Sequence, residues 1–429
     1  MHAAKLRPWS RRSPSVKLSA QINGPYLFLL YYQVQTREND TLPRLPSALS
    51  SVILLLSVTA PLSARAERVL ADDDSCECYL INNDQGTYYT HHRFFDFRNL
   101  SEYAGVPPVI RDAASSARAE ATSDYFLSDE WKTFWMLNTW NNSASRRADA
   151  TVAMVNSPNN VYIEASTEAT PTSHTWLTLR TQRLAGFQTA AEFETISDRF
   201  KYLSIRMRAR TVGAPGAITA LFTYRTADTL AEVQEADLEI RTSDPRDVLH
   251  YTNQPSYTEA GDVIPGATIN TTMPGGREWT SWATHRLDWT PGRTTWYVDG
   301  EETASSEFQA PRDESTIIVN AWSDGGIWTG NMSRFDAAYL QVQWIELVFN
   351  STARRNGPGG DEVSKKKVRR GGERGCKVVC SIDETPLLGT PVLLWESGAA
   401  RRLRDGGIVA WVPRAVVLVT VLVATGLVG

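Results

Sequence analysis

Apolar and polar residues alternate along several short segments of this chain. Between residues 203 and 210, the odd positions are Leu, Ile, Met and Ala, and the even positions are Ser or Arg. Successive side chains of a β-strand point to opposite faces, so this pattern predicts a strand with one buried face. Similar apolar runs predict further strands at residues 217–224, 235–239, 248–252, 282–289, 294–298, 316–322 and 339–349.

Turn residues separate these predicted strands. Asp299-Gly300 follows the run 294–298 directly, and this pair favours a two-residue hairpin turn. From about residue 74 to residue 352 no long amphipathic helix pattern occurs. Many short strands with regular turn signals predict an all-β fold, a sandwich or barrel formed by one domain.

Three carboxylates lie within one of the predicted strands. Glu235, Asp237 and Glu239 alternate with Ala236 and Leu238, so all three acids project from the same face. Such acids repel one another and raise at least one pKa, which a fold seldom retains unless a ligand or a reaction needs it. Two carboxyl groups that face one bond are typical of glycoside hydrolysis. An exposed acidic strand is the alternative explanation of the bare pattern, and the neighbouring residues must decide between the two.

Composition limits the classes of function. The chain has 429 residues, of which 42% are hydrophobic, enough for one large all-β domain or for two to three smaller ones. A net charge of -4 with 44 Lys and Arg residues gives no electrostatic indication of nucleic-acid binding. The six histidines are scattered and His91-His92 has no ligand spacing around it, so no metal site is predicted.

The N-terminal part of the chain differs from the predicted domain at residues 74–352. Residues 46–66 form an apolar segment that ends in the cleavage pattern Ala64-Arg65-Ala66, which is typical of a signal peptide. Residues 1–45 are an extension before it, which a mistaken start codon explains best; a long natural leader and a signal anchor are the alternatives. All three explanations place the domain outside the cytoplasm.

The C-terminal part also differs from the predicted domain. Residues 353–407 are basic and glycine-rich and contain a cysteine pair, a composition that predicts a disordered tail. Residues 408–429 are hydrophobic. They are short for a membrane helix and fit the signal for a glycolipid anchor, in which this segment is removed.

The four cysteines occur as two pairs, Cys76/Cys78 and Cys376/Cys380. In an oxidising compartment they suggest disulfides, for which three connectivities are open. Cross-pairing would close a loop of about 300 residues and stabilise the fold by about 5 kcal/mol. A zinc site is the rival explanation, but neither pair has the usual C-x-x-C spacing. N-glycosylation sequons agree with an extracellular compartment and occur at Asn99, Asn141, Asn270, Asn331 and Asn350.

Four motifs in order then resemble one known family. Residues 235–239 carry the pattern E-x-D-x-E, residues 250–253 read His-Tyr-Thr-Asn, and residues 282–300 contain the elements W-x-P-G and W-Y-V-D-G. The fourth motif is the pair of late segments Asn-Ala-Trp at 320–322 and Trp-Thr-Gly at 328–330. With these motifs, residues 180–352, and more loosely the chain from Cys76, resemble the family 16 glycoside hydrolases, which include licheninases and laminarinases. The resemblance implies a concanavalin A-like β-sandwich, the jelly roll.

The resemblance also assigns roles to the acidic strand. Glu235 would be the nucleophile that forms a covalent glycosyl-enzyme, and Glu239 would be the acid/base. Asp237 would share a proton with the nucleophile, so that the titrations of the three groups are coupled. A gap of about 5 to 5.5 Å between the two glutamate carboxyls would give retention of configuration.

Sugar rings stack on aromatic side chains in this family, and the resemblance therefore implies a set of substrate contacts. They are Trp322, Trp328, Tyr251, Asn320, Tyr224 and Glu192, while Trp289, Trp296 and Trp344 are assigned to the core. Three departures from the family pattern leave the substrate open, one of them Leu249, which stands where the family has a polar residue. Residues 231–234 lack a tryptophan that many licheninases carry, and Glu194 stands where relatives often carry arginine.

We therefore expect a secreted or surface-attached retaining glycoside hydrolase that cleaves a β-1,3 or mixed β-1,3/1,4 glucan, such as that of a fungal cell wall. A cell-wall transglycosylase on the same fold is the nearest alternative, and a lectin without catalysis is the second. We expect a monomer whose partner is the polysaccharide, with membrane attachment through a lipid anchor alone. No cofactor is expected, although some family members hold a structural calcium.

Overall fold

The computed structural model describes residues 17–22, 28–33, 69–82, 87–143, 147–169, 171–352, 375–383 and 385–397. Contacts divide the chain into two units, Met1–Glu67 and Arg68–Gly429. In the first unit, β1 (Lys17–Ile22) and β2 (Phe28–Gln33) form an antiparallel pair. The second unit contains all the other elements described below.

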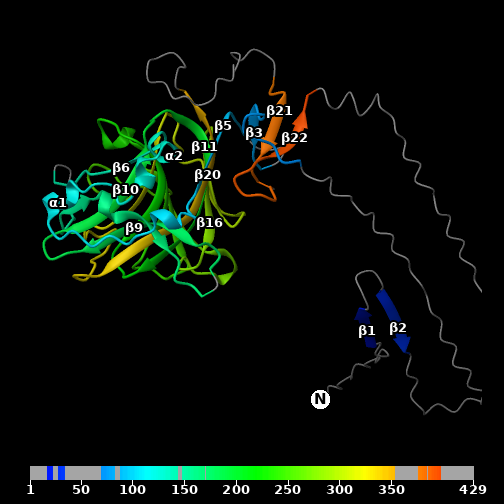
Figure 1. Ribbon diagram of the computed structural model, residues 1–429, viewed down its shortest axis with the longest axis horizontal. Coiled ribbons are helices and arrows are strands. Elements are labelled where there is room, and N and C mark those ends of the chain that lie inside the picture. The colour runs from blue at the N-terminus through cyan, green and yellow to red at the C-terminus, as the bar shows by residue number, and fades with distance from the viewer. Residues whose placement is uncertain are drawn as a thin grey trace, which may run out of the picture. The chain divides into compact units, whose positions relative to one another are not determined.

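Two facing layers of antiparallel strands make up most of the second unit (Figure 1). The first layer contains, in spatial order, β15 (Thr268–Thr272), β14 (Val248–Gln254), β13 (Gln234–Arg241), β12 (Ile218–Arg225), β19 (Thr316–Trp322), β10 (Gln188–Thr195) and β6 (Trp135–Leu137). The second contains β8 (Val161–Ala165), β9 (Thr175–Arg183), β20 (Ala337–Ser351), β11 (Phe200–Gly213), β16 (Ala283–Thr290), β17 (Arg293–Val298) and β18 (Glu301–Ser306). β5 (His91–Asp96) pairs with β20, and β7 (Met154–Asn156) runs parallel to β10.

Helical segments are few and short in the described ranges. They are α1 (Ala113–Ala117), α2 (Asp129–Lys132), η2 (Ser101–Tyr103), η3 (Asp124–Leu127), η4 (Pro158–Asn160), η5 (Leu230–Glu232) and η6 (Pro274–Gly276). None of these segments has the length and the apolar character that crossing a membrane requires. The prediction of an all-β jelly-roll sandwich is confirmed.

The predicted alternation accounts for how the layers pack. On β11, Leu203, Ile205 and Met207 are buried in the core between the layers, and Arg206 and Arg208 point away from it. Every strand expected from the sequence is present, and the hairpin between β17 and β18 turns at Asp299-Gly300, both with positive φ. The predicted core residues Trp289 and Trp296 lie in this core, whereas Trp344 is buried on the outer face of the second layer, under the Arg206 guanidinium.

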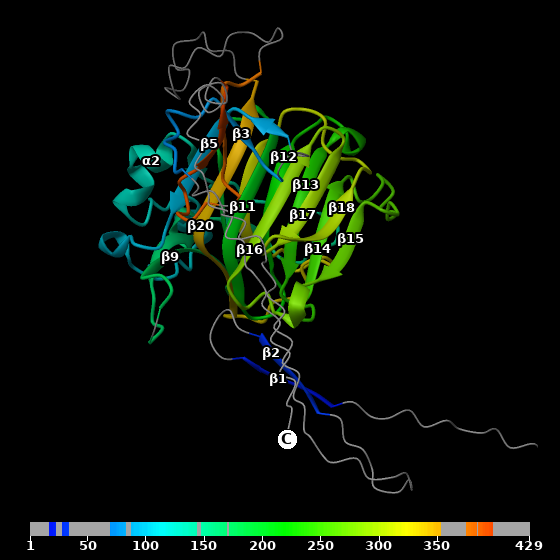
Figure 2. The same ribbon diagram turned by 90° about the vertical axis from the view of Figure 1, so that its right-hand side faces the viewer.

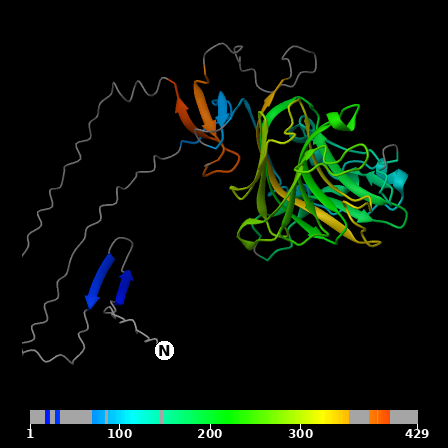
Figure 3. The same ribbon diagram turned by 180° about the vertical axis from the view of Figure 1, so that it is seen from behind.

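The segments before and after the sandwich meet in a separate small sheet, in the order β22 (Val392–Glu396), β21 (Val378–Ser381), β3 (Cys78–Leu80) and β4 (Tyr88–Tyr89). We call it the terminal sheet; Figure 2 and Figure 3 show it from two sides. Two disulfides, Cys76–Cys380 and Cys78–Cys376, connect its N-terminal and C-terminal parts. The cross-paired connectivity is therefore the one that the structure contains.

Buried charges attach the terminal sheet to the outer face of the second layer. Glu346 on β20 is fully buried and accepts hydrogen bonds from Arg206 at 2.5 Å and 2.9 Å. His92 lies between Glu346 and Asp73, at 3.0 Å and 2.8 Å. Arg206 also donates to the carbonyl of Ile382, just after β21, at 2.5 Å. Each buried charge thus has a partner of the opposite sign, which keeps the cost of its burial low.

The domain boundaries predicted from the sequence need one correction. Residues 375–383 and 385–397 fall in the segment 353–407, for which we expected a disordered tail, but they form ordered strands with disulfides. The basic, glycine-rich composition of the segment gave no local sign of these strands. They pair with a strand about 300 residues earlier in the chain, which a local pattern does not reveal. The predicted signal peptide at 46–66 and the hydrophobic segment at 408–429 lie outside the described residues.

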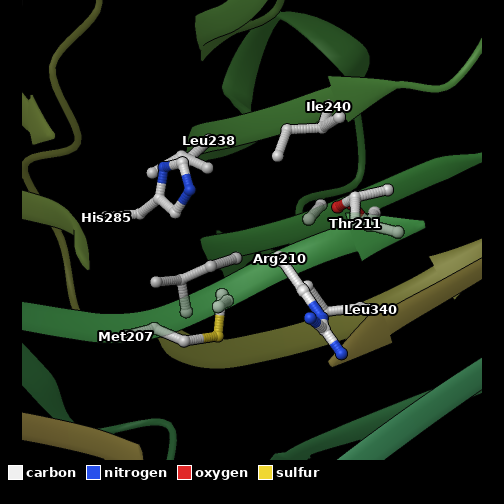
Figure 4. Close-up of a pocket in the computed structure, with 11 residues that line it drawn as sticks. Met207, Arg210, Thr211, Leu238, Ile240, His285 and Leu340 are labelled. Carbon is white, nitrogen blue, oxygen red and sulfur yellow. The ribbon is translucent and has the colours of Figure 1, made fainter. Parts of the chain in front are cut away.

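A small cavity of about 10 Å³ lies between the two layers (Figure 4). Met207 and His285 line it from the second layer, and Leu238 and Ile240 line it from the first. Its volume is enough for about one water molecule. His285 is buried, and neither ring nitrogen has a hydrogen-bond partner among the described residues.

Acid is expected to destabilise the domain through His285. Burial lowers the pKa of this imidazole from 6.5 to about 4. Because the pKa is lower in the folded state, the unfolded chain takes up the proton first. Above about pH 6.5, His285 therefore leaves the free energy of unfolding unchanged. At pH 4 it lowers the free energy of unfolding by about 3 kcal/mol. Urea unfolding of His285→Leu should show a weaker loss of stability between pH 6.5 and pH 4 than the wild type, whereas the exposed control His174→Leu should match the wild type. Equal pH dependence in all three proteins would contradict this account.

Candidate active site

The three carboxylates of β13 lie on one face of the first layer, as the alternation predicts. Ala236 and Leu238 between them are buried in the core on the opposite face. Glu235 and Glu239 are partly exposed, whereas Asp237 between them is buried. The neighbouring strands pair in register, with β12 on one side and β14 on the other. The acids therefore form a row on this face, and a ligand bound at the centre of the face would contact them.

Asp237 interacts with Glu235, which lies two positions earlier on β13. Burial, together with the charges of Glu235 and Glu239, raises the pKa of Asp237 well above its ordinary value. Gln254 of β14 donates to Asp237 at 3.2 Å. Burial raises the pKa of Glu235 to about 7, although a hydrogen bond with Asp237 lowers it. In its protonated form, Asp237 would donate to Glu235 and favour the ionised form of that glutamate.

Glu239 has a different set of neighbours. The indole Nε1 of Trp328 donates to both carboxyl oxygens, at 3.2 Å and 3.3 Å. Burial raises the pKa of Glu239 to about 7, and the Trp328 hydrogen bond and the charges of Arg147 and Arg241 lower it. The surroundings of the two glutamates thus differ, because Glu235 has an acid as its neighbour, whereas Glu239 accepts from an indole and is subject to the charges of two guanidinium groups. Such a difference in surroundings separates the tasks of two carboxyl groups.

A fourth carboxylate, Glu192, lies on β10 of the same layer. In the register between β10 and β19 it is opposite Asn320. Three side chains donate to it: Trp140 Nε1 at 2.5 Å, Asn138 at 2.8 Å and Asn320 at 3.2 Å. Burial raises the pKa of Glu192, and these three hydrogen bonds lower it. The structure thus brings the predicted contacts Glu192 and Asn320 together. Asn138 and Trp140 were not predicted; their spacing of two, which places both on one face of an extended segment, was the available signal.

Arg147 is a residue of this site that sequence reasoning missed. Its guanidinium forms a two-pronged pair with Asp324, at 2.8 Å and 2.9 Å. The same group lies over the ring of Trp322, with Cζ 5.4 Å from the ring centroid. Trp322 is partly exposed, but Arg147 covers one face of its indole. No local pattern marks Arg147, because its partner lies 177 residues later.

Two further predicted contacts have different outcomes. Tyr224 pairs in register with Glu235, so its position is on the same face as the acids. Tyr251 pairs with Leu238, is completely buried, and stacks on Trp296 at 5.0 Å between ring centroids. The prediction that Tyr251 contacts sugar is therefore wrong. The alternation of side chains along a strand explains this outcome. His250 is opposite Glu239 and lies on the face of the acids, so the next residue, Tyr251, lies on the core face.

Metal ligands do not gather at this site. Within the described ranges, no group of three or more His, Cys, Asp or Glu side chains is arranged to hold a metal ion. Calcium also binds backbone and amide oxygens, so the structural calcium considered from the sequence stays a prediction.

Solved structures with a similar arrangement include two glucanases. The beta-glucanase of Bacillus licheniformis has a TM-score of 0.40 and 19% sequence identity, and the match covers 50% of this chain and 92% of that one. The laminarinase catalytic domain of Thermotoga maritima has a TM-score of 0.39 and 17% identity, and the match covers 52% of this chain and 93% of that one.

Sequence relatives carry the name beta-glucanase. The one from Paenibacillus polymyxa is 27% identical over 139 residues, which are 32% of this chain and 54% of the relative. The one from Bacillus amyloliquefaciens is 25% identical over 150 residues, which are 34% of this chain and 59% of the relative. The chain thus spans between half and three fifths of the length of these curated relatives.

The family model described as Glycosyl hydrolases family 16 matches residues 149–346. This range includes the acidic strand β13, the motifs at 250–253 and 282–300, and the loop that carries Trp328. Residues 149–346 of this chain therefore belong to glycosyl hydrolase family 16.

Proposed function

We propose that this chain is a retaining glycoside hydrolase that cleaves a β-1,3 or mixed β-1,3/1,4 glucan by double displacement. One observation carries the proposal: Glu235 and Glu239 lie on one face of the first layer, on either side of a buried Asp237, and their surroundings differ. The relatives named beta-glucanase support the choice of glucan as the substrate class.

In the first displacement, the Glu235 carboxylate attacks the anomeric carbon and forms an ester bond to the sugar. The glycosidic carbon–oxygen bond breaks, and Glu239 gives its proton to the departing oxygen. The Asp237 hydrogen bond favours the ionised form of Glu235, which this attack requires. Glu239 must carry its proton at the same moment, which its raised pKa of about 7 favours.

In the second displacement, water attacks the anomeric carbon of the glycosyl ester. Glu239, now ionised, removes a proton from this water, and Glu235 leaves as a carboxylate. Two inversions return the original configuration at the anomeric carbon. If a sugar hydroxyl takes the place of water, the same intermediate leads to transfer, as in a wall-remodelling transglycosylase.

Product analysis on soluble β-1,3, β-1,4 and mixed-linkage glucans tests this proposal. We expect new reducing ends and shorter oligosaccharides from the β-1,3 or the mixed-linkage polymer. Proton NMR during the first minutes should show the β-anomer as the initial product. Longer chains without new reducing ends would instead identify a transglycosylase. Binding without cleavage or transfer would identify a lectin, and an initial α-anomer would overturn the retaining mechanism.

The location outside the cytoplasm belongs to the same proposal. Two disulfides support it, because such bonds persist in oxidising compartments. The sequon residues Asn99 and Asn141 are exposed and thus accessible to glycosylation, whereas the Asn350 amide is engaged by Thr90 and by the carbonyl of Tyr88. A monomer and a C-terminal lipid anchor remain predictions from the sequence.

A further inference from the structure

Glu239 is the proposed acid/base, and an unassigned cluster of side chains surrounds the indole that binds it. Arg241 follows Glu239 by two positions on β13, so both project from the same face. His250 on β14 is the register partner of Glu239. Asp244 in the turn between the two strands completes the cluster. None of these three side chains has a role in the chemistry proposed so far.

Arg241 and His250 hold the Trp328 indole from two sides. The Arg241 guanidinium lies over the ring, with Cζ 4.5 Å from the centroid, a separation typical of a cation–π contact. His250 meets the ring edge-on, with 5.3 Å between centroids and 71° between planes. Between them, the Nε1 of Trp328 reaches both oxygens of Glu239. The indole is therefore fixed by its face and by its edge while it donates to the carboxylate.

The two holding residues are themselves fixed. His250 Nε2 lies 2.6 Å from Asp244, and His250 Nδ1 lies 2.8 Å from the side-chain oxygen of Asn270 on β15. Asp244 also lies 3.6 Å from Arg241, close enough for an ion pair but too far for a hydrogen bond. A single carboxylate thus orients both the guanidinium and the imidazole.

The backbone of the Trp328 loop is held against the same turn. Gly330 has a φ of +76°, which favours glycine, and a Cβ there would lie 2.9 Å from the Oγ of Ser243. Thr329 is buried and donates to Asp324 at 3.2 Å. The position of the indole therefore depends on two loops that pack closely together, and it is set before any substrate arrives.

We propose that Trp328 is a positioning residue, held by Arg241 and His250, which orients the Glu239 carboxylate and stabilises its negative charge. The inference rests on the proposed function, because it assigns a task to groups around the acid/base of that reaction. It also changes the role of Trp328, which the sequence resemblance implied to be a sugar contact.

The physical reason lies in the two states of the acid/base. Glu239 gives up its proton in the first displacement and must be ionised when it activates water in the second. Burial alone favours the protonated form, so a buried glutamate without donors would hold its proton too firmly. An indole N–H that points at the carboxylate favours the ionised form, and a cation on the ring face makes that N–H a stronger donor.

Several titratable or charged groups lie around Glu239, and the experiment must separate their effects. From β13 they are Glu235, Asp237 and Arg241; from β14, His250; from the turn, Asp244; and from the loops, Arg147 and Asp324. Arg147 lowers the pKa of Glu239 by charge alone, because it is bound to Asp324. Only the Trp328 cluster offers Glu239 a hydrogen bond among the described residues.

The experiment compares pH profiles of kcat/KM for wild type, Trp328→Phe and Arg241→Met on a soluble β-glucan. Phenylalanine keeps a ring and removes the N–H, and methionine keeps the aliphatic stem and removes the cation. Since kcat/KM reports the free enzyme, its alkaline limb follows the proton on Glu239. We expect the alkaline limb to move up by about one pH unit in Trp328→Phe and by a smaller amount in Arg241→Met. Arg241→Lys, which retains the cation, should restore most of the wild-type profile.

Trp140→Phe is the matched control, because the indole N–H of Trp140 also donates to a carboxylate, that of Glu192. We expect it to raise KM and to leave the alkaline limb in place. If Trp328→Phe also raises KM with an unchanged limb, Trp328 is a sugar contact and the inference is overturned.

A measurement without substrate keeps the inference separate from the proposed function. The indole N–H resonance of Trp328 should titrate with Glu239 in wild type, and in Arg241→Met its midpoint should move to higher pH. An indole resonance that is insensitive to pH would overturn the inference even in an active enzyme. Conversely, a wild type that titrates as expected but leaves all glucans intact would overturn the proposed function alone.

Discussion

Glu235→Gln is expected to reduce glucan cleavage by about 10⁴-fold or more. Glutamine has nearly the shape of glutamate but cannot form the glycosyl ester, so the first displacement is lost. Glu239→Gln should reduce cleavage by about 10²- to 10⁴-fold, the usual contribution of a general acid and base. The measurement is the rate of reducing-end formation at saturating glucan for each purified variant.

Activated substrates separate the two roles. A fluoride or nitrophenyl leaving group departs without a proton, so Glu239→Gln should form the glycosyl ester from such a substrate and accumulate it. Glu235→Gln should fail with every substrate. The matched control is Glu301→Gln, which changes an exposed glutamate of β18, in the layer opposite the one that carries the acidic row. Cleavage at more than a tenth of the wild-type rate by Glu235→Gln would show that another group is the nucleophile.

Removal of both disulfides is expected to lower the free energy of unfolding by about 7 kcal/mol in total. Cys76–Cys380 and Cys78–Cys376 connect residues 304 and 298 positions apart, so each closes nearly the same large loop. When one bond is removed, the other still closes that loop, and the loss should be about 2 kcal/mol. Loss of the remaining bond then releases the large loop and costs about 5 kcal/mol more. The effects of the two bonds are therefore expected to be strongly non-additive.

Urea unfolding of three alanine variants measures this coupling. Two of them each remove one bond, and the third removes both. Because Cys76 and Cys380 are buried, the Cys76–Cys380 variant should be somewhat less stable than the Cys78–Cys376 variant, which opens less of the core. Additive losses, or a double variant as stable as a single one, would show that the chains of the terminal sheet stay together without the bonds. In that case the buried pairs of Glu346 with Arg206 and His92 would be sufficient to hold them.

The periodic features of the sequence predicted the framework well. Alternation located the strands, and the hairpin at Asp299-Gly300 followed from the turn preference of that dipeptide. The shared face of Glu235, Asp237 and Glu239 followed from period two alone. The same rule, applied to Tyr251, would have placed it in the core, and the family resemblance misled the prediction at that position.

Contacts between distant segments could not be predicted from the sequence. Arg147 binds Asp324 across 177 positions, and Trp328 binds Glu239 across 89. The terminal sheet joins two segments about 300 residues apart, one of which has the composition of a tail. A short stretch of sequence does not specify which distant loops come into contact, because that contact depends on the path of every strand between the two loops.

By itself, the amino-acid sequence determined the strands, the faces of their side chains and the row of acids, because each of these follows from backbone geometry that repeats every two residues. The tertiary structure decided which carboxyl meets an acid and which meets an indole, that Arg147 covers Trp322, and that Tyr251 lies in the core. It decided them because proton affinity and access depend on what packs around a group, and that packing exists only once the two layers and their loops have come together.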